Sequence, residues 1–528
     1  MPMAISAGFG FNRLHHLPFR SPFRNYFLQV RVGYAAAVDA FYSTETDKVT
    51  DRSSSGGATG KAPQWKKLKS EELGICTKKI SRPTRVVLNG LKSSGFEVYL
   101  VGGCVRDLIL NRIPKDFDII TSAELREVVR LFSRSEIIGR RFPICHVHIG
   151  NTTVEVSSFS TRAQRYGRNL SWDPEKPLSC DENDYVRWSN CLQRDFTING
   201  LLFDPYKKLV YDYMGGVNDI RKAKVRTIKP ASLSLTEDCA RILRAIRIAA
   251  RLGFRFSKET ALAVKKLSGS VIRLDRGRLL MEVNYMMAYG SAEASLRLLW
   301  KLGLLDILLP VQAAYFVRNG FVRRDKRYNM LLSLFANLDK LLAPDRPCNN
   351  SLWFAILAFN AALSEQPRDP TVISAFSLAL NNGGDLPEAC NIARRINKQH
   401  DSSFPELSEP QNLDSDTLME DVLDLAASVR TALMNMTDVH FVSQAMAKYP
   451  EAPISDLVFF PLPLYLRACK IFECIGGGGE RIKRCGGKHG SKIDYEWLAM
   501  GSVKEVRHVF ARVVFDTIYP LDYTLPNK

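Results

Sequence analysis

Acidic residues are absent from the first 38 positions of this 528-residue chain. The same stretch carries four arginines among aromatic and aliphatic residues, Arg13, Arg20, Arg24 and Arg31. A segment that bears arginine, lacks acid and has no compact apolar core is typical of organellar import signals and excludes a secretory signal peptide. Because serine is scarce there, residues 1–38 are predicted to direct the chain to the mitochondrion, with the plastid as the alternative.

Regularly spaced cysteines and long apolar runs are also missing. The eleven cysteines form no C-x-x-C pair, which argues against a disulfide framework and for a reducing compartment. The candidate metal ligands with the closest spacing are Cys469, Cys474, Cys485 and His489. Their spacing matches no zinc template, so no structural zinc is expected. The best apolar run, residues 352–363, is shorter than the roughly 20 residues of a membrane span. It predicts a buried helix, and no membrane contact is expected.

Positive charge, in contrast, is in excess. The chain contains 73 Lys and Arg residues against 55 Asp and Glu residues, which gives a net charge of +18. Such an excess attracts polyanions, so a nucleic acid or an anionic membrane surface is the class of partner that charge alone indicates.

Changes in composition define the expected domains. Residues 43–62 are polar and rich in Gly and Ser, which predicts a flexible linker over residues 39–77. From residue 78 to 232, short β-like runs alternate with helices, whereas later residues show helical periodicity only. The expected fold class is α+β. A small mixed-sheet head occupies residues 78–232, a helical neck residues 233–310, and a helical body and tail residues 311–528.

Two carboxylates lie close together in the run DFDII, residues 116–120, which is predicted to be a strand. Side chains two apart on a strand share a face, so Asp116 and Asp118 are expected to point the same way. Paired hard oxygen ligands suit Mg²⁺, and a two-metal phosphoryl-transfer site requires such a pair. On its own, Asp-x-Asp is also a common pattern at a solvated strand end.

A glycine pair stands just before these carboxylates. Gly102 and Gly103 follow the predicted strand EVYLV and open a helix, where backbone N–H groups bind phosphate. Arg106, in the first turn of that helix, has the geometry to pair with phosphate oxygens, and Asp107 could orient it. The sequence therefore predicts a triphosphate site beside the carboxylate pair.

A third carboxylate is Glu155, in the predicted strand TTVEVSSF that follows a hairpin turn at Gly150 and Asn151. It shares a face with Thr153 and Ser157. Glu155 is predicted to complete the metal site or to activate the attacking hydroxyl. The alternative is an exposed strand residue paired with a lysine.

The run QRDFTING, residues 193–200, interleaves polar and apolar residues. Arg194 is expected to contact phosphate, and Asp195 or Asn199 a ribose hydroxyl. The helix that follows residue 236 places four arginines in one sector: Arg241, Arg244, Arg247 and Arg251.

Asp238 precedes the first of those arginines by three residues, so Asp238 and Arg241 together could recognise a base edge. A carboxylate accepts from an exocyclic amine and a guanidinium donates to a ring nitrogen, a pairing that adenine and cytosine both satisfy.

In combination and order, these runs resemble the class II nucleotidyltransferases of the polymerase-β-like superfamily. That family contains the CCA-adding tRNA nucleotidyltransferases and the bacterial poly(A) polymerases. The resemblance covers about residues 80–310 and is carried by residues 100–123, by QRDFTING, by YDYMGGVNDI from Tyr211 and by EDCARILRAIRIAARLGF. It implies a nucleotidyltransferase head with helical neck, body and tail.

The resemblance also assigns roles residue by residue. Asp116 and Asp118 match the metal-binding pair, which implies a two-metal Mg²⁺ site, and Gly103 and Arg106 match nucleotide contacts. Arg194 and Asp195 match the ribose-side motif, in which Asp195 is sometimes counted among the catalytic carboxylates. The base- and phosphate-recognising helix is matched by Asp238, Arg241, Arg244 and Arg247. Gln193 departs from the pattern, because the family usually has a second arginine there.

Residues 137–149, IIGRRFPICHVHI, look like the segment that distinguishes the bacterial poly(A) polymerases. Arg140 and Arg141 are expected to shape the base pocket so that only ATP fits. The expected function is therefore template-independent addition of AMP from ATP to RNA 3′ ends. The alternatives are a CCA-adding enzyme and a non-catalytic RNA-binding protein. One departure is the C-terminal DTIYPLDYTLPNK, which is not the strongly basic tail frequent in that branch.

Overall fold

The computed structural model describes residues 65–139, 143–161, 180–449, 455–476, 487, 488 and 490–520, and every structural statement below refers to these. The predicted targeting segment, the specificity residues Arg140 and Arg141, and the residues Cys485 and His489 lie outside the described residues.

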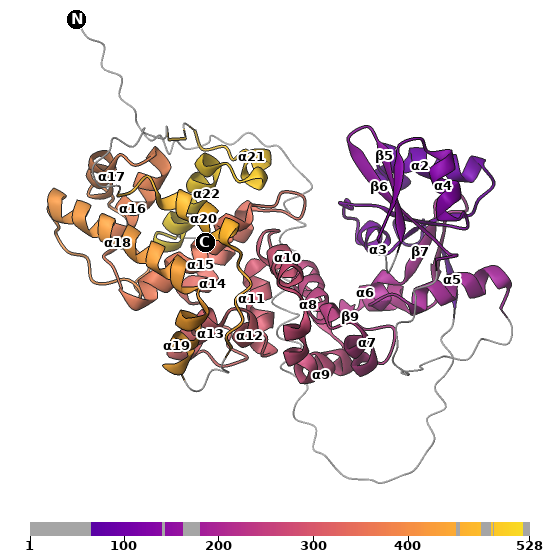
Figure 1. Ribbon diagram of the computed structural model, residues 1–528, viewed down its shortest axis with the longest axis horizontal. Helices are drawn as coiled ribbons and strands as arrows, with labels where there is room; N and C mark the ends of the chain where they lie inside the picture. Colours follow the sequence, from indigo (N-terminus) through magenta and orange to yellow (C-terminus); the bar gives the residue numbers. More distant parts are fainter. Residues whose placement is uncertain are drawn as a thin grey trace, which may run out of the picture. The chain divides into compact units, whose positions relative to one another are not determined.

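An eight-stranded sheet forms the head (Figure 1), in the order β1-β8-β7-β2-β3-β6-β5-β4. Neighbouring strands are antiparallel, except for β3 and β6, which are parallel. The strand bounds are β1 Lys66–Lys69, β2 Val98–Val101, β3 Asp118–Thr121, β4 Ser135–Ile138, β5 Ile144–Ile149, β6 Thr152–Ser158, β7 Leu201–Asp204 and β8 Leu209–Asp212.

Alternation along the central strands gives the sheet two buried faces. One face, which includes Leu100 and Ile119, packs against α2 (Arg82–Ser93) and α4 (Leu125–Leu131) in the main core. The other face is aromatic: Tyr99 and Tyr211 cluster there with Trp188 of α5 (Glu182–Leu192). Coverage on both faces makes the sheet a rigid base for side chains at its strand ends.

The sheet differs from the prediction at two strands, β1 and β3. Residues 66–69 were expected to belong to the linker, but they form β1, which pairs with β8, and Leu73 and Ile75 are buried in the core. The predicted strand at residues 116–120 begins at Asp118, so Asp116 lies in the bend before β3. The hairpin of β5 and β6 is confirmed, with its turn at Gly150 and Asn151.

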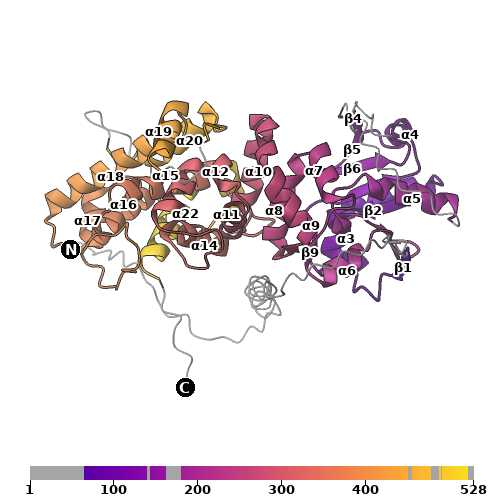
Figure 2. The ribbon, with the colours of Figure 1, turned by 90° about the horizontal axis from the view of Figure 1, so that it is seen from below.

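Helices follow the sheet as predicted (Figures 1 and 2). The neck contains α7 (Ala231–Glu237), α8 (Ala240–Leu252), α9 (Lys258–Leu267), α10 (Arg276–Met287) and α11 (Ala292–Lys301). The short strands β9 (Lys224–Val225) and β10 (Arg255–Phe256), which the sequence did not predict, pair in parallel beside α8. Thus α8 is fixed to the head by β9 and to the later helices by α10 and α11.

The body is built from longer helices around one core. They are α13 (Pro310–Arg318), α14 (Met330–Leu341), α15 (Asn350–Glu365), α16 (Pro370–Asn382), α17 (Leu386–Ala393), α18 (Ser415–Asn435), α19 (Val439–Ala447), α20 (Leu462–Phe472), α21 (Tyr495–Met500) and α22 (Val503–Ile518), after the single turn α12 (Leu305–Leu308). The apolar run at residues 352–363 is buried in α15, as expected. Within the described ranges, no helix combines the length and the apolarity needed to cross a membrane.

Candidate active site

Carboxylates from two neighbouring strands meet at one end of β3. Asp118, the first residue of β3, lies between Val101 of β2 and Glu155 of β6 in the sheet register. Burial, then the charge of Glu155, raises the pKa of Asp118 to about 6; Arg194 opposes this shift, and the nearby Asp116 adds to it. The structure therefore brings Asp116 and Glu155 to Asp118. Glu155 also lies 3.8 Å from His146, measured from Oε1 to Nε2.

The glycine turn lies directly against this group. Gly102 follows β2 with a φ of +78° and starts α3 (Gly103–Ile109). A Cβ at Gly102 would lie 3.0 Å from an Arg194 side-chain nitrogen and 3.6 Å from Asp118 Oδ2. Glycine is required here both for the positive φ and for the close approach. The turn, Asp118 and Arg194 thus converge on one small region.

Arg106 lies at the start of α3, just after the glycine turn, as the sequence predicts. It is buried, and its guanidinium donates to Asp107 Oδ1 at 2.9 Å and to Asn199 Oδ1 at 2.7 Å. Asp107 therefore orients Arg106, as expected. Because its donors are engaged inside the protein, this geometry favours a positioning role for Arg106 over direct phosphate contact.

The hydrogen-bonded chain continues from Arg106 into the neck. Asn199 donates to Asp195 Oδ1 at 3.0 Å, and Arg244 of α8 donates to Asp195 Oδ2 at 3.0 Å. Burial opposes ionisation of Asp195, but Arg244, Asn199 and the backbone N–H of Phe196 outweigh it and hold its pKa below the usual range. Both Asp195 oxygens are engaged in this way. The geometry thus associates Glu155, rather than Asp195, with Asp118.

The predicted arginine helix is α8, and its arginines line one half-buried face opposite buried aliphatic residues. Asp238 lies just before α8 with a partly exposed carboxylate, 4.0 Å from Arg241 Nε. Arg241 also donates to the Ser234 hydroxyl at 2.8 Å. Arg247 pairs with the buried Glu282 of α10 at 3.2 Å. No local sequence pattern predicted the roles of Glu282 and Ser234, because their arginine partners lie on another helix, α8.

The donor set at β3 fits a divalent metal ion. Asp116 and Asp118 supply hard carboxylate oxygens, and a cation bound there would stabilise the charged form of Asp118, which burial and the neighbouring carboxylates Glu155 and Asp116 disfavour. In the described part of the chain, no group of three or more His, Cys, Asp or Glu residues is arranged to hold a metal ion. The fit therefore rests on the aspartate pair.

Arg194 carries a second sign of a missing partner. Its Nε is buried and has no hydrogen-bond partner among the described residues. A buried donor left unpaired is costly, so an anion in this region would satisfy it. Arg194 lies against the Gly102 turn, and its charge favours the ionised form of Asp118.

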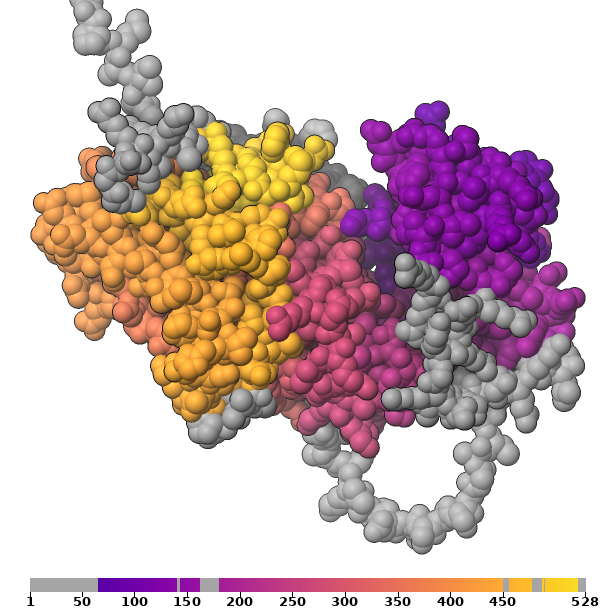
Figure 3. Space-filling view, viewed as in Figure 1, coloured from indigo at the N-terminus to yellow at the C-terminus, as the bar shows by residue number. Residues whose placement is uncertain are grey.

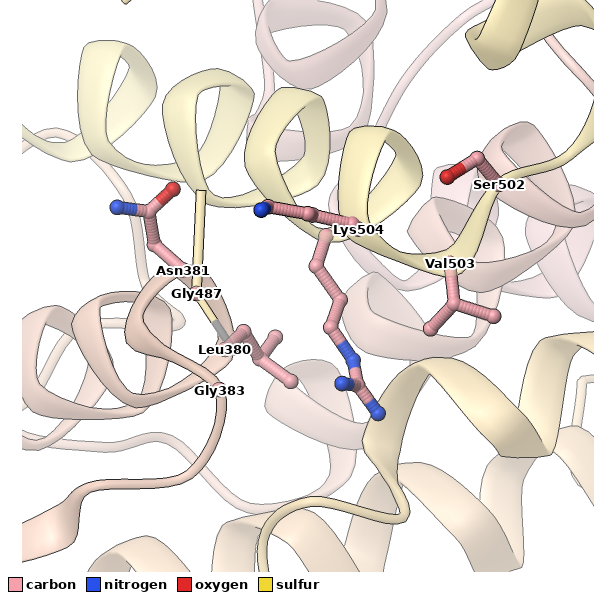
Figure 4. A pocket seen from close by; sticks show the side chains of 8 residues that line it. Leu380, Asn381, Gly383, Gly487, Ser502, Val503 and Lys504 are labelled. Atoms are coloured by element: carbon pink, nitrogen blue, oxygen red, sulfur yellow. The ribbon is translucent and has the colours of Figure 1, made fainter. Parts of the chain in front are cut away.

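A separate hollow of about 270 Å³ lies in the body, between α16 and α22 (Figure 4). Its lining comes from residues 380, 381, 383, 487, 502–504 and 507. It includes Arg507, which is occupied by the backbone carbonyls of Lys470 and Ile471. This hollow is distinct from the head residues that carry chemistry, so it is not the candidate active site.

Two family models match the chain in order. The model described as "Poly A polymerase head domain" matches residues 98–226, which contain strands β2 to β9. The model described as "Probable RNA and SrmB-binding site of polymerase A" matches residues 253–316, in the neck and the start of the body.

Individual proteins with similar sequences include poly(A) polymerases and CCA-adding enzymes. The chain is 33% identical to "Poly(A) polymerase I" of Escherichia coli O6:H1 over 343 residues, which cover 62% of this chain and 71% of that protein. It is 30% identical to the "CCA-adding enzyme" of Staphylococcus aureus over 220 residues, 41% of this chain and 52% of that one. A solved structure of the Bacillus stearothermophilus CCA-adding enzyme in complex with CTP matches with a TM-score of 0.42 and 20% identity, covering 75% of this chain and 93% of that chain.

Paired carboxylates at a sheet end, a glycine turn against them and an arginine-lined helix define a nucleotidyltransferase. The sequence matches identify the family within this class of enzymes. The chain belongs to the family of the bacterial-type poly(A) polymerases and CCA-adding enzymes, which are template-independent RNA nucleotidyltransferases.

Proposed function

We propose that this protein adds AMP from ATP to RNA 3′ ends and releases pyrophosphate. The observation that carries the proposal is the position of Asp118 beside Glu155 and against the Gly102 turn. The longer match to poly(A) polymerase I and the poly(A)-like segment at residues 137–149 favour ATP over CTP.

In the proposed reaction the RNA 3′ oxygen bonds to the α-phosphorus of ATP, and the bond from that phosphorus to the β-bridging oxygen breaks. Asp116 and Asp118 would hold two Mg²⁺ ions. When bound, these ions lower the pKa of the attacking hydroxyl and neutralise the leaving pyrophosphate. Glu155 either completes this site or accepts the proton of the hydroxyl.

The protein's own residues position the nucleotide. The backbone N–H groups at Gly102 and Gly103 and the guanidinium of Arg194, which lies beside this turn, bind the triphosphate. Asp238 and Arg241 contact the base edge. Asp195 and Asn199, which link Arg106 to Arg244, keep the glycine turn and α8 at a fixed separation, which preserves the alignment of phosphate and base.

The deciding experiment incubates the purified full chain and Mg²⁺ with each labelled nucleoside triphosphate. Two acceptors are compared: a generic RNA and a tRNA without its CCA end. ATP incorporation well above CTP incorporation on generic RNA is expected. Efficient CTP incorporation confined to the tRNA would establish the CCA-adding alternative, and RNA binding without incorporation of any nucleotide would overturn the catalytic reading.

Two assignments outside the head accompany this proposal. The neck and body, residues 233–310 and 311–528, bind the RNA. Residues 1–38 direct the chain to the mitochondrion, with the plastid as the alternative, because that stretch has no acid and carries spaced arginines. A reporter fused to residues 1–38 is expected to enter an organelle, and a cytosolic reporter would refute the targeting assignment.

A further inference from the structure

Two tyrosines form an aromatic pair at the end of α10. The rings of Tyr285 and Tyr289 lie 5.3 Å apart between centroids, tilted by 40°. Both side chains are partly exposed. Neither hydroxyl has a hydrogen-bond partner among the residues that the structure describes, so the contacts of these residues are made by their rings.

A cation lies against each ring. The guanidinium carbon of Arg247, on α8, lies 4.9 Å from the centroid of the Tyr285 ring. Lys115 Nζ lies 5.1 Å from the centroid of the Tyr289 ring. Cation–π contacts of this length orient aromatic rings, and the same cations attract phosphate.

Ion pairs between α8 and α10 fix the position of Tyr285. Glu282, one turn before Tyr285 on α10, is buried and lies between Arg247 at 3.2 Å and Arg278 at 2.9 Å. This ion triad holds the Arg247 guanidinium under the Tyr285 ring. A surface that is already ordered loses little conformational entropy when a ligand stacks on it.

The two cations come from segments that also carry candidate site residues. Lys115 immediately precedes Asp116, and Arg247 follows Arg241 and Arg244 on the same face of α8. The rings therefore bridge the loop that leads into β3 and the nucleotide-recognising helix. In the space-filling view, the loop before β3 is coloured purple and α10 pink (Figure 3).

We propose that Tyr285 and Tyr289 form a stacking platform for the last bases of the RNA acceptor strand, which brings the 3′ hydroxyl to Asp116 and Asp118. The inference rests on the proposed function, because it assumes an RNA acceptor. Aromatic stacking binds single-stranded bases with little sequence preference, and Lys115 and Arg247 attract the adjoining phosphates. An enzyme that extends ends without a template needs this tolerance.

The test uses the full chain and a short RNA whose 3′-terminal nucleotide carries 2-aminopurine, which loses fluorescence when it stacks. Neither nucleotide nor metal is added, so the result does not depend on catalysis. Wild-type protein is expected to quench the fluorescence. Tyr285→Leu with Tyr289→Leu is expected to abolish the quench and to weaken RNA binding about tenfold or more, as loss of a stacked base does.

Three matched variants sharpen the result. Tyr285→Phe with Tyr289→Phe keeps the rings and is expected to retain the quench. Tyr289→Leu alone, at a turn, tests the platform with less risk to folding and is expected to reduce the quench. Tyr206→Leu removes a tyrosine under Lys92 at the turn between β7 and β8, and is expected to leave the quench unchanged.

Quenching by a folded double Leu variant at the wild-type level would overturn the platform, as would a wild-type protein that binds the RNA without quenching. A loss of ATP affinity with RNA affinity intact would also overturn it and would assign the rings to the incoming base. Failure of the wild type to incorporate ATP would instead refute the proposed function, and the quench would still decide the platform.

Discussion

Arg106 donates to Asn199 Oδ1 at 2.7 Å, which joins the helix after the glycine turn to a segment 93 residues later in the chain. Through Asp195 the same contact reaches Arg244 on α8. The helix after the glycine turn and α8, to which we assign phosphate binding and base recognition, are thereby connected by buried and partly buried hydrogen bonds.

Asn199→Ala is expected to lower kcat by tenfold or more and the free energy of unfolding by about 1–3 kcal/mol, because it removes the acceptor of the buried Arg106 guanidinium and one of the donors to Asp195 Oδ1. Steady-state kinetics and urea unfolding measure the two effects. Asn89→Ala, which removes only an exposed hydrogen bond from Tyr206, is the control and is expected to change neither. Wild-type kinetics for Asn199→Ala would show that the linkage has no catalytic importance.

Asp116→Ala and Asp118→Ala are each expected to abolish nucleotide transfer and leave the fold intact. Without divalent metal, Asp118→Ala is expected to raise the melting temperature slightly, because it removes a buried carboxylate crowded by Glu155 and Asp116. Transfer assays and thermal melts in a chelator test this. Glu136→Ala, at an exposed glutamate of β4, should keep activity. Normal turnover by either aspartate variant would exclude the metal assignment.

Gly102→Ala is expected to destabilise the protein by about 2–3 kcal/mol, because alanine disfavours the φ of +78° and its Cβ would meet Arg194 at 3.0 Å. KM for ATP should rise as Arg194 is displaced. Gly74→Ala is the matched control: its φ is +67°, but a Cβ there meets nothing within 4 Å. It should cost about 1 kcal/mol with KM unchanged. Equal KM values for the two variants would contradict the crowding at Arg194.

Acid stability should depend on Asp184 of α5. Burial opposes its ionisation, but Lys67, Arg187 and Tyr213 hydrogen-bond to it at 2.7–2.8 Å and hold its pKa well below the usual range. A carboxyl whose pKa is lower in the folded state stabilises the protein above its unfolded pKa, near 4, and this stabilisation is lost as the pH falls further.

Asp184→Asn should therefore reduce the free energy of unfolding by about 3 kcal/mol at pH 7 and flatten its fall below pH 4. Urea unfolding between pH 3 and pH 7 measures both effects. Glu182→Gln, at an exposed residue of the same helix, is the control. An Asp184→Asn profile parallel to the wild type would refute this assignment.

Arg140→Ala with Arg141→Ala is expected to relax the preference for ATP over CTP by about 1–3 kcal/mol, because a pocket shaped for a purine would lose its support. Ratios of kcat/KM for the two nucleotides on generic RNA provide the measurement. An unchanged ratio would place nucleotide selection elsewhere.

Local patterns predicted much of the head. Strand alternation correctly placed Ile119 in the core and Asp118 on the other face, and helical periodicity correctly gave α8 its arginine face. Strand β1 escaped prediction because KKLK has too few apolar residues to indicate a strand, and its order comes from pairing with β8. The bond between Arg106 and Asn199, and that between Arg247 and Glu282, join distant segments that no local pattern connects.

Strand β1 limits how much of the N-terminal part of the chain can be removed. Trp65 packs against Trp188 and Tyr213, and Lys67 reaches the buried Asp184. A protein shortened to start at Lys78, where order was expected to begin, would leave β8 as a bare edge strand, and its unpaired backbone groups would invite aggregation. Any shortened form of the chain must therefore begin at or before Trp65 if β8 is to keep its partner strand.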